Sequence, residues 1–191
     1  MNTTYRHPSI CLRLVLTAFA LAGSASAEEV YFLRGGFDIF STGMNQMASQ
    51  LRKEGINAKA TSFAGWRGLA DGIVRRSKNK SVSYPIVVLG HSFGGDAAPD
   101  FANYLGRHNI PVALVVGLDP LSSKTLHKGA KSVINYRTPT GGRYTAANDF
   151  TGRINQVNAS EFGANHFTVE ENRSVQNLAL QAVRAEIRKR R

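Results

Sequence analysis

Short apolar runs alternate along the chain with segments whose apolar residues recur every three or four positions. Apolar runs of this length predict buried strands, and the helical recurrence predicts amphipathic helices. Strands are predicted at residues 30–33, 56–60, 85–89, 111–116, 131–136 and 153–157. Helices are predicted from Thr42 to about Gly55, over 66–74, over 97–105 and along the C-terminal segment.

The order of these elements predicts the fold class. Strands that alternate with helices are typical of a mostly parallel sheet with helices on both faces, so we expect a three-layer α/β/α sandwich. The runs 86–89 and 112–116 are continuously apolar, as central strands buried on both faces should be. Residues 138–151 predict a long loop. No internal repeat or linker interrupts the pattern, and we expect residues 28–191 to form a single domain.

The C-terminal helix carries a start signal. Thr168 and Glu171 have the spacing of a capping box, in which the two side chains satisfy free backbone N–H groups of the first turn. The predicted buried face of this helix consists of Val175, Leu178, Ala179, Ala182 and Ile187.

Residues 1–27 have the pattern of an export signal. A basic leader precedes a mostly apolar stretch at 14–21, and the small residues of ASA at 25–27 provide a cleavage pattern ahead of Glu28. The apolar stretch is short for a membrane span, so a membrane anchor is the weaker interpretation. We therefore expect this signal peptide to be removed and the mature protein to be periplasmic or secreted, with no transmembrane segment.

Positive charge dominates the composition. The 191 residues include 24 Lys and Arg against 13 Asp and Glu, a net charge of +11. Removal of the signal takes away Arg6, Arg13 and no acid, which leaves +9, and it takes away the single cysteine, Cys11. Thiol and disulfide chemistry is therefore excluded from the mature chain. The dispersed basic residues favour a solvated surface, with contact to an anionic surface left open, over a specific nucleic-acid site.

The sequence PIVVLGHSFGGD places a serine among glycines directly after a predicted buried strand. Gly90, Ser92 and Gly94 have the G-x-S-x-G spacing of a nucleophile elbow. Such an elbow holds the serine in strained backbone angles, and side chains two positions away would collide with neighbouring elements. The alternative is a packing turn with a bystander serine, but the strand before and the helix after favour the elbow. Ser92 is therefore the candidate nucleophile.

A serine hydroxyl needs a base to accept its proton, and a histidine oriented by a carboxylate meets that need. His166 follows the last predicted strand and precedes the last helix, which places it at the carboxyl edge of the sheet with Ser92. Other roles fit the other histidines: packing beside the turn for His91, and solvated positions for His108 and His127. We predict His166 as the base.

Asp119 and Asp149 are the two candidates to orient the histidine, because Asp96 and Asp100 lie on the predicted helix after the elbow and are expected to face solvent. Asp119 follows the apolar run 112–116, and Pro120 forces the chain to leave the strand, so Asp119 is predicted at the carboxyl edge of the sheet. Asp149 lies in the predicted loop with no strand before it. Asp119 is the predicted acid, and Asp149 stays as the alternative.

The chain order Ser92, Asp119, His166 resembles that of the α/β-hydrolase superfamily, and the resemblance covers nearly all of the chain after the signal. The segment YFLRGGF at 31–37 resembles the family's first core strand and oxyanion loop. An acid placed after the strand that follows the elbow is similar to thioesterase domains and some lipases. Residues 120–130 leave little room for a helical lid, and a small, lidless, exported chain is similar to cutinase-like esterases, although those carry disulfides.

The resemblance implies an oxyanion hole and a substrate site. In this family the N–H after the nucleophile, here that of Phe93, and a second N–H from the early loop, here Gly36 or Phe37, hold the oxyanion. We expect Phe37, Phe40 and Leu121 to contact substrate. No cofactor is expected, and neither an H-x-x-x-H motif nor a paired-carboxylate cluster points to a metal.

Two classes of function follow from these observations. The first is a serine hydrolase that cleaves a carboxylic ester of a small molecule, a lipid or the cell envelope through an acyl-enzyme, with an acyltransferase that uses the same residues as a variant. Export argues against coenzyme A thioesters, and the positive charge favours an anionic lipid or envelope ester. The second is a non-catalytic protein that binds an envelope polymer or nucleic acid on a hydrolase scaffold. Labelling by a fluorophosphonate, which requires an activated serine, separates the two.

Overall fold

The computed structural model describes residues 28–36 and 42–189, together with Met1. A 6-stranded sheet has the order β2-β1-β3-β4-β6-β8, and every neighbouring pair in it is parallel. Its strands are β1 (Glu29–Arg34), β2 (Ala58–Ser62), β3 (Ile86–His91), β4 (Val112–Leu118), β6 (Ala130–Arg137) and β8 (Arg153–Asn158). The two edge strands, β2 and β8, carry the exposed basic residues Lys59 and Arg153.

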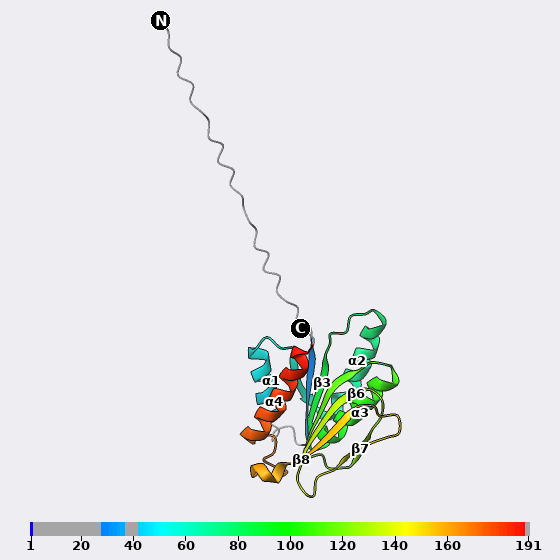
Figure 1. The fold of residues 1–191 in the computed structure, drawn as a ribbon, viewed down its shortest axis with the longest axis vertical. Helices are drawn as coiled ribbons and strands as arrows, with labels where there is room; N and C mark the ends of the chain where they lie inside the picture. Colours follow the sequence, from blue (N-terminus) through cyan, green and yellow to red (C-terminus); the bar gives the residue numbers. More distant parts are fainter. Residues whose placement is uncertain (2–27, 37–41, 190–191) are drawn as a thin grey trace.

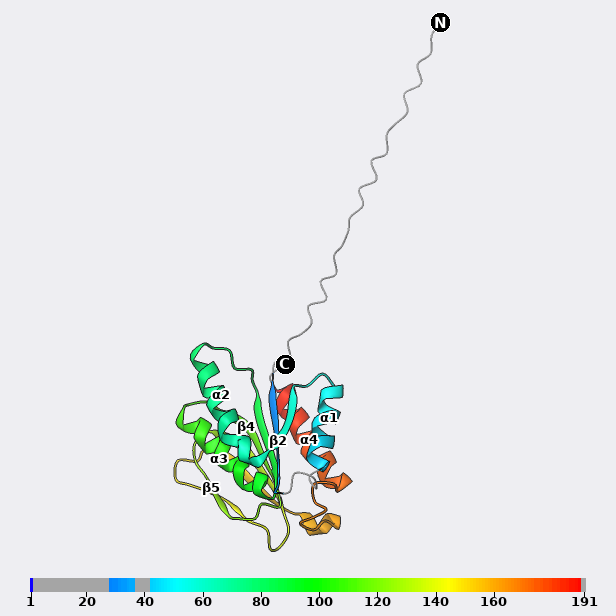
Figure 2. The ribbon, with the colours of Figure 1, turned by 180° about the vertical axis from the view of Figure 1, so that it is seen from behind.

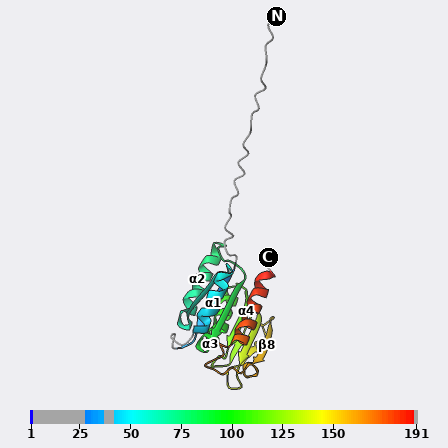
Figure 3. The same ribbon diagram turned by 90° about the vertical axis from the view of Figure 1, so that its left-hand side faces the viewer.

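Helices cover both faces of this sheet. Helices α1 (Thr42–Lys53) and α4 (Arg173–Arg188) lie on one face, and α2 (Trp66–Lys78) and α3 (Phe93–Arg107) lie on the other (Figures 1 and 2). In Figure 3, which views the molecule from the side, α1 and α4 stand in front of the sheet. The three-layer α/β/α sandwich predicted from the sequence is confirmed, and its sheet is wholly parallel.

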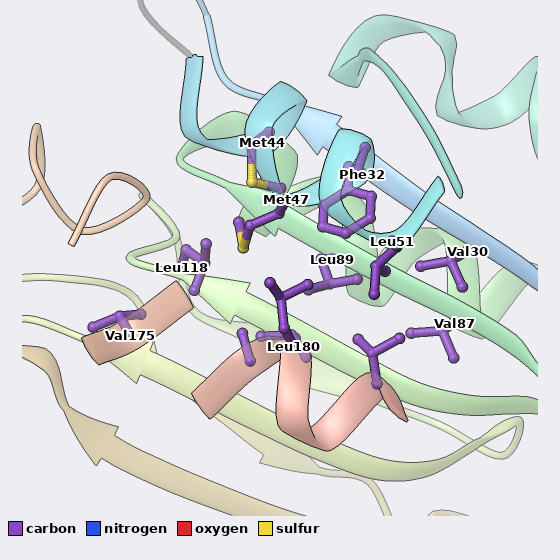
Figure 4. Packing of buried hydrophobic residues seen from close by; sticks show 14 of the residues in the cluster. Val30, Phe32, Met44, Met47, Leu51, Val87, Leu89, Leu118, Val175 and Leu180 are labelled. Carbon is purple, nitrogen blue, oxygen red and sulfur yellow. The ribbon is translucent and has the colours of Figure 1, made fainter. Parts of the chain in front are cut away.

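A buried apolar layer on each side of the sheet holds the sandwich together. Successive residues of β1 divide between the layers: Val30 and Phe32 pack towards α1 and α4, and Tyr31 and Leu33 pack towards α2 and α3. Each fully buried large apolar side chain stabilises the fold by about 1.5 to 3 kcal/mol. The layer drawn in Figure 4 includes Phe32, Met44, Met47, Leu51, Leu89, Leu118, Val175 and Leu180.

The segment 138–151 differs from the predicted loop. It contains β7 (Tyr144–Ala146), which pairs in parallel with β5 (Lys124–Leu126) to form a 2-stranded sheet. The hydroxyl of buried Tyr144 donates a hydrogen bond to the backbone oxygen of Gly95, which fixes this small sheet to α3. Strands of 3 residues are too short for a periodic pattern, so the sequence carries no signal for them.

The predicted start of the last helix is wrong. Helix α4 begins at Arg173, and Asn172 caps it by accepting hydrogen bonds from two N–H groups of the first turn. Thr168 and Glu171 lie in the turn that precedes the helix. The buried face is displaced as well, because Leu178 is exposed and Ala182 is only partly buried. The buried residues of α4 are Val175, Ala179, Leu180, Val183 and Ile187.

The described part of the chain holds no helix that is both long and apolar enough to cross a membrane. Residues 119–129, between β4 and β6, contain β5 and no helix. The predicted signal at 1–27 lies outside the described residues, as do Phe37 and Phe40.

Candidate active site

Parallel strands bring the three predicted site residues to one edge of the sheet. Ser92 directly follows β3 and Asp119 directly follows β4, and these two strands are neighbours. The N–H of Ser92 donates to the backbone oxygen of Leu118 at 3.1 Å, so the backbone pairing continues past the end of β3. His166 lies in the turn segment after β8 and the short helix η3 (Ala159–Phe162).

Ser92 sits in a strained turn between β3 and α3. Its φ of 56° and ψ of −120° are rare for a residue with a side chain and cost on the order of 1 to 3 kcal/mol. Backbone packing explains the flanking glycines: a Cβ on Gly90 would lie 1.9 Å from the oxygen of Gly94, and a Cβ on Gly94 would lie 2.0 Å from the oxygen of Leu33. The geometry is that of the predicted elbow.

His166 and Asp119 are hydrogen-bonded. Nδ1 of His166 lies 2.8 Å from Oδ2 of Asp119, whose side chain is buried. The carboxylate also accepts from Thr138, whose N–H lies 2.6 Å and whose hydroxyl lies 2.9 Å from Oδ1. Because a carboxylate only accepts, this contact places the hydrogen of the neutral imidazole on Nδ1 and leaves Nε2 free to accept a proton. Asp119 itself has a φ of 47°, a second strained position at this edge.

Ser92 is linked to this pair through its neighbour in the chain. His91, the neighbour of Ser92, contacts His166 with 5.3 Å between ring centroids. Among the hydrogen bonds of the described residues, none joins Ser92 to His166. Catalytic hydrogen bonds of this kind are often long before substrate binds.

The alternative carboxylate, Asp149, belongs to another pair. Its Oδ1 lies 2.9 Å from Nδ1 of His127, and both side chains are about half exposed, at 50% and 51%. It makes no hydrogen bond with His166 among the described residues. The structure therefore places Asp119, and not Asp149, against the predicted base.

Two of the three residues predicted to form the oxyanion hole, Phe93 and Gly36, lie in the described part of the chain. Phe93 is the first residue of α3, so its backbone N–H belongs to the helix terminus that has no partner within the helix. Gly35 and Gly36 run directly past it: a Cβ on Gly35 would lie 3.0 Å from Cβ of Ser92, and a Cβ on Gly36 would lie 2.9 Å from the ring of Phe93. Phe37, the other candidate for the second N–H, lies outside the described residues. The early loop thus passes beside the serine, as an oxyanion hole requires.

Exposed apolar side chains lie next to the three residues in the chain. Each of Phe93, Leu121 and Phe167 lies one or two positions from Ser92, Asp119 or His166 in the chain, and their exposed fractions are 45%, 45% and 83%. Isolated exposed apolar residues are ordinary, and their position beside the three site residues is the feature that bears on substrate. A cavity of about 410 Å³ adjoins His166, and polar side chains make up much of its wall. It is lined by Thr138, Thr140, Ser160, Ala164, Asn165, His166 and Phe167.

Some residues of the site escape prediction from the sequence. Thr138 is a partner of Asp119 because β6 lies beside β4, and only strand order could reveal this. His91, predicted to pack beside the turn, does so and also contacts the backbone of His166 through Nε2 at 2.9 Å. Within the described residues, no group of three or more His, Cys, Asp and Glu side chains is placed to hold a metal ion.

Comparisons with known proteins add little at the level of sequence. No family model and no curated protein matches the chain. A solved structure from Xanthomonas campestris pv. campestris, described as a "putative hydrolase of the alpha/beta superfamily", is similar to it with a TM-score of 0.48 and 14% identity. The match covers 82% of this chain and 98% of that chain. The fold class itself is established by the parallel sheet and its two helical layers, with which the predicted resemblance to the α/β-hydrolase superfamily agrees.

Proposed function

We propose that this protein is a serine hydrolase that cleaves carboxylic esters through an acyl-enzyme. The observation that carries the proposal is the arrangement of a strained serine at the elbow with a histidine whose Nδ1 is bonded to a buried aspartate at 2.8 Å. Strained backbone is retained where it serves a function, since it lowers the stability of the fold. A non-catalytic binding protein has no nucleophile to hold, so the strain favours the hydrolase.

The proposed reaction begins with attack of Ser92 Oγ on the ester carbonyl carbon. Nε2 of His166 accepts the serine proton, and the carboxylate of Asp119 stabilises the imidazolium that forms. The N–H of Phe93 and a second N–H of the early loop stabilise the negative charge on the carbonyl oxygen. The C–O bond to the alcohol then breaks, and His166 donates its proton to the leaving oxygen.

Water completes the cycle in the second half of the reaction. His166 accepts a proton from a water molecule whose oxygen attacks the acyl carbon, and the proton returns to Ser92 Oγ as the acid leaves. An alcohol in place of water would give an acyltransferase. The exposure of the site favours water, because His166 is 29% exposed and bulk solvent reaches it.

The side chains around the site support an ester with an apolar acyl group. Phe93, Leu121 and Phe167 offer apolar surface to substrate, and Phe63 stacks on Phe93 with 5.2 Å between ring centroids. A lipid or an envelope ester has this character. With the predicted signal at 1–27, we propose that the protein acts in the periplasm or outside the cell.

A chain-length series of p-nitrophenyl esters tests the activity and the acyl preference together. We expect turnover of esters with apolar acyl groups and covalent labelling of Ser92 by a fluorophosphonate, with both lost in Ser92→Ala. If the folded wild-type protein neither hydrolyses any ester of the series nor reacts with the probe, the proposal is wrong. That result would favour a non-catalytic binding function.

A further inference from the structure

Two buried ionisable side chains beside the site have no step in the mechanism above. His91 is 8% exposed and Glu170 is 0% exposed. His91 ends β3 immediately before Ser92, and Glu170 lies in the turn segment four positions after His166. Burial of an imidazole and a carboxyl group lowers the stability of the fold unless they form hydrogen bonds. Side chains of this kind at buried positions beside a site are therefore candidates for a functional role.

His91 is held between two groups of the segment that carries the base. Its Nε2 lies 2.9 Å from the backbone oxygen of His166, and its Nδ1 lies 3.7 Å from Oε2 of Glu170. The His91 and His166 rings are also in contact, at 5.3 Å between centroids. A side chain anchored on a central strand therefore touches the backbone and the ring of His166 and the turn that follows it.

The atoms involved define how His91 is protonated. A carbonyl oxygen only accepts, so Nε2 of His91 carries the hydrogen that is donated to His166. Burial lowers the pKa of His91, which favours the neutral imidazole with a lone pair on Nδ1. That lone pair faces the carboxyl group of Glu170 at 3.7 Å, which is contact but is too long for a hydrogen bond. The hydrogen bond that ties His91 to this segment is therefore the one donated by Nε2 to the backbone oxygen of His166.

His166 needs support of this kind because of where it lies. The segment between η3 and α4 is made of turns, so no strand or helix fixes the backbone of the base. The contact with Asp119 orients the imidazole ring of His166. It does not fix the position of the His166 backbone, which other groups must hold. Small displacements of a catalytic group matter, since about 1 Å can lower a rate on the order of 100-fold.

We propose that His91 and Glu170 form a buried positioning pair that holds the backbone of His166 and thereby sets the distance from its imidazole to Ser92. The inference rests on the proposed hydrolase function, in which His166 is the base. Neither member of the pair touches the reacting atoms; both act through His166. The role goes beyond packing beside the elbow, because it depends on a hydrogen-bond donor at Nε2.

Two substitutions at His91 separate the donor from the packing. Glutamine can place an amide N–H near the position of Nε2, whereas leucine fills similar space without a donor. We expect kcat for a soluble p-nitrophenyl ester to fall roughly 10- to 100-fold in His91→Leu with KM nearly unchanged, because the base is displaced and binding is not. His91→Gln should recover most of the lost kcat. His127→Leu, which removes an exposed histidine from a separate pair, is the matched control and should keep the wild-type kcat.

Glu170 provides a second, independent pair of variants. Glu170→Gln keeps the shape and offers an amide N–H to Nδ1 of His91, and Glu170→Ala removes the contact. We expect the glutamine variant to retain more kcat than the alanine variant. The unfolding temperature of each variant shows whether it folds. If His91→Leu does not fold, the comparison of the two Glu170 variants tests the proposal in its place.

The outcomes are distinct. A folded His91→Leu protein with wild-type kcat, or equal losses in His91→Leu and His91→Gln, overturns the positioning pair and leaves the hydrolase intact. Equal kcat for the two Glu170 variants contradicts it as well. Absence of ester hydrolysis and of fluorophosphonate labelling in the wild-type protein overturns the proposed function, and the inference with it.

Discussion

Nδ1 of His166 lies 2.8 Å from Oδ2 of Asp119, although the two residues are 47 positions apart in the chain. The sheet makes this contact, because β4 and β8 lie in it with only β6 between them. Thr138 directly follows β6, and its N–H and hydroxyl both donate hydrogen bonds to Asp119. The carboxylate is thus held by a neighbouring strand end and does not depend on the histidine for its position.

Removing the charge of Asp119 should lower turnover sharply. Asp119→Asn keeps the shape of the side chain but presents an amide that no longer stabilises the imidazolium or selects its tautomer, and the loss in kcat is expected on the order of 10⁴. Steady-state hydrolysis of a p-nitrophenyl ester measures it. Asp149→Asn is the matched control, because it alters an exposed carboxylate bonded to His127. A larger loss in the Asp149 variant would show that the wrong acid has been assigned.

The strain at Ser92 predicts an unusual order of stabilities. In the interior of a helix or strand, glycine lowers stability by about 0.5 to 1 kcal/mol relative to alanine, because it gives the unfolded chain more conformational entropy to lose on folding. At a φ of 56° and a ψ of −120° the order should reverse, since glycine adopts this conformation freely and a residue with a Cβ pays on the order of 1 to 3 kcal/mol there. Urea unfolding of Ser92→Gly and Ser92→Ala, both inactive, compares the two directly. An alanine variant as stable as the glycine variant would contradict the strain.

An ion pair between buried Glu29 and partly exposed Arg76, far from the site, predicts the acid sensitivity of the fold. Burial tends to raise the pKa of Glu29, but hydrogen bonds from Arg76, Tyr31 and Ser83 outweigh it and hold the pKa below its ordinary value of 4.5. The folded state therefore favours the carboxylate, so this contribution is complete above pH 4.5 and is lost as the pH falls below that value. Arg76 donates to both carboxylate oxygens, at 2.5 and 2.7 Å.

Arg76→Met tests this contribution. We expect the free energy of unfolding near pH 7 to fall by roughly 1.5 to 3 kcal/mol, as for hydrogen bonds to charged groups. When the pH is lowered from 5 to 3, the free energy of unfolding should fall by less in Arg76→Met than in the wild type. Arg75→Met, at an exposed neighbouring position, should change stability by no more than about 0.5 kcal/mol. Parallel pH curves for wild type and Arg76→Met would argue against the assigned cause.

Export predicts the start of the mature chain. If residues 1–27 are a cleaved signal, the intact mass of protein recovered from the periplasm or the medium of the native host should correspond to a chain that begins at Glu28. Substitution of Ala25 and Ala27 by bulky residues should slow the cleavage. A full-length product confined to the cytosol would refute the proposed location.

The parts of the fold that follow from local pattern could be predicted. The central strands are continuous apolar runs such as 86–89 and 112–116, and a parallel sheet accounts for them without knowledge of contacts. Ser92, Asp119 and His166 each follow a predicted strand, so the sheet edge gathers them whatever the details of the loops.

The parts that depend on contacts between distant segments could not be predicted. The roles of Thr138 and Glu170 arise from neighbours in space, and their own surroundings in the sequence give no sign of them. The capping-box spacing of Thr168 and Glu171 fits a turn as well as a helix start, so the helix was placed too early and Leu178 was assigned to the wrong face. Phe37 and Phe40 stay predictions, since they lie outside the described residues.

The edges of the sheet bear on how copies of this protein behave near one another. Edge strands β2 and β8 present backbone groups that can pair with another chain, which is a common route to aggregation. Lys59 on β2 and Arg153 on β8 are exposed, so two copies that approach edge to edge bring like charges together. Like charge on the two sheet edges therefore disfavours the edge-to-edge association of two copies.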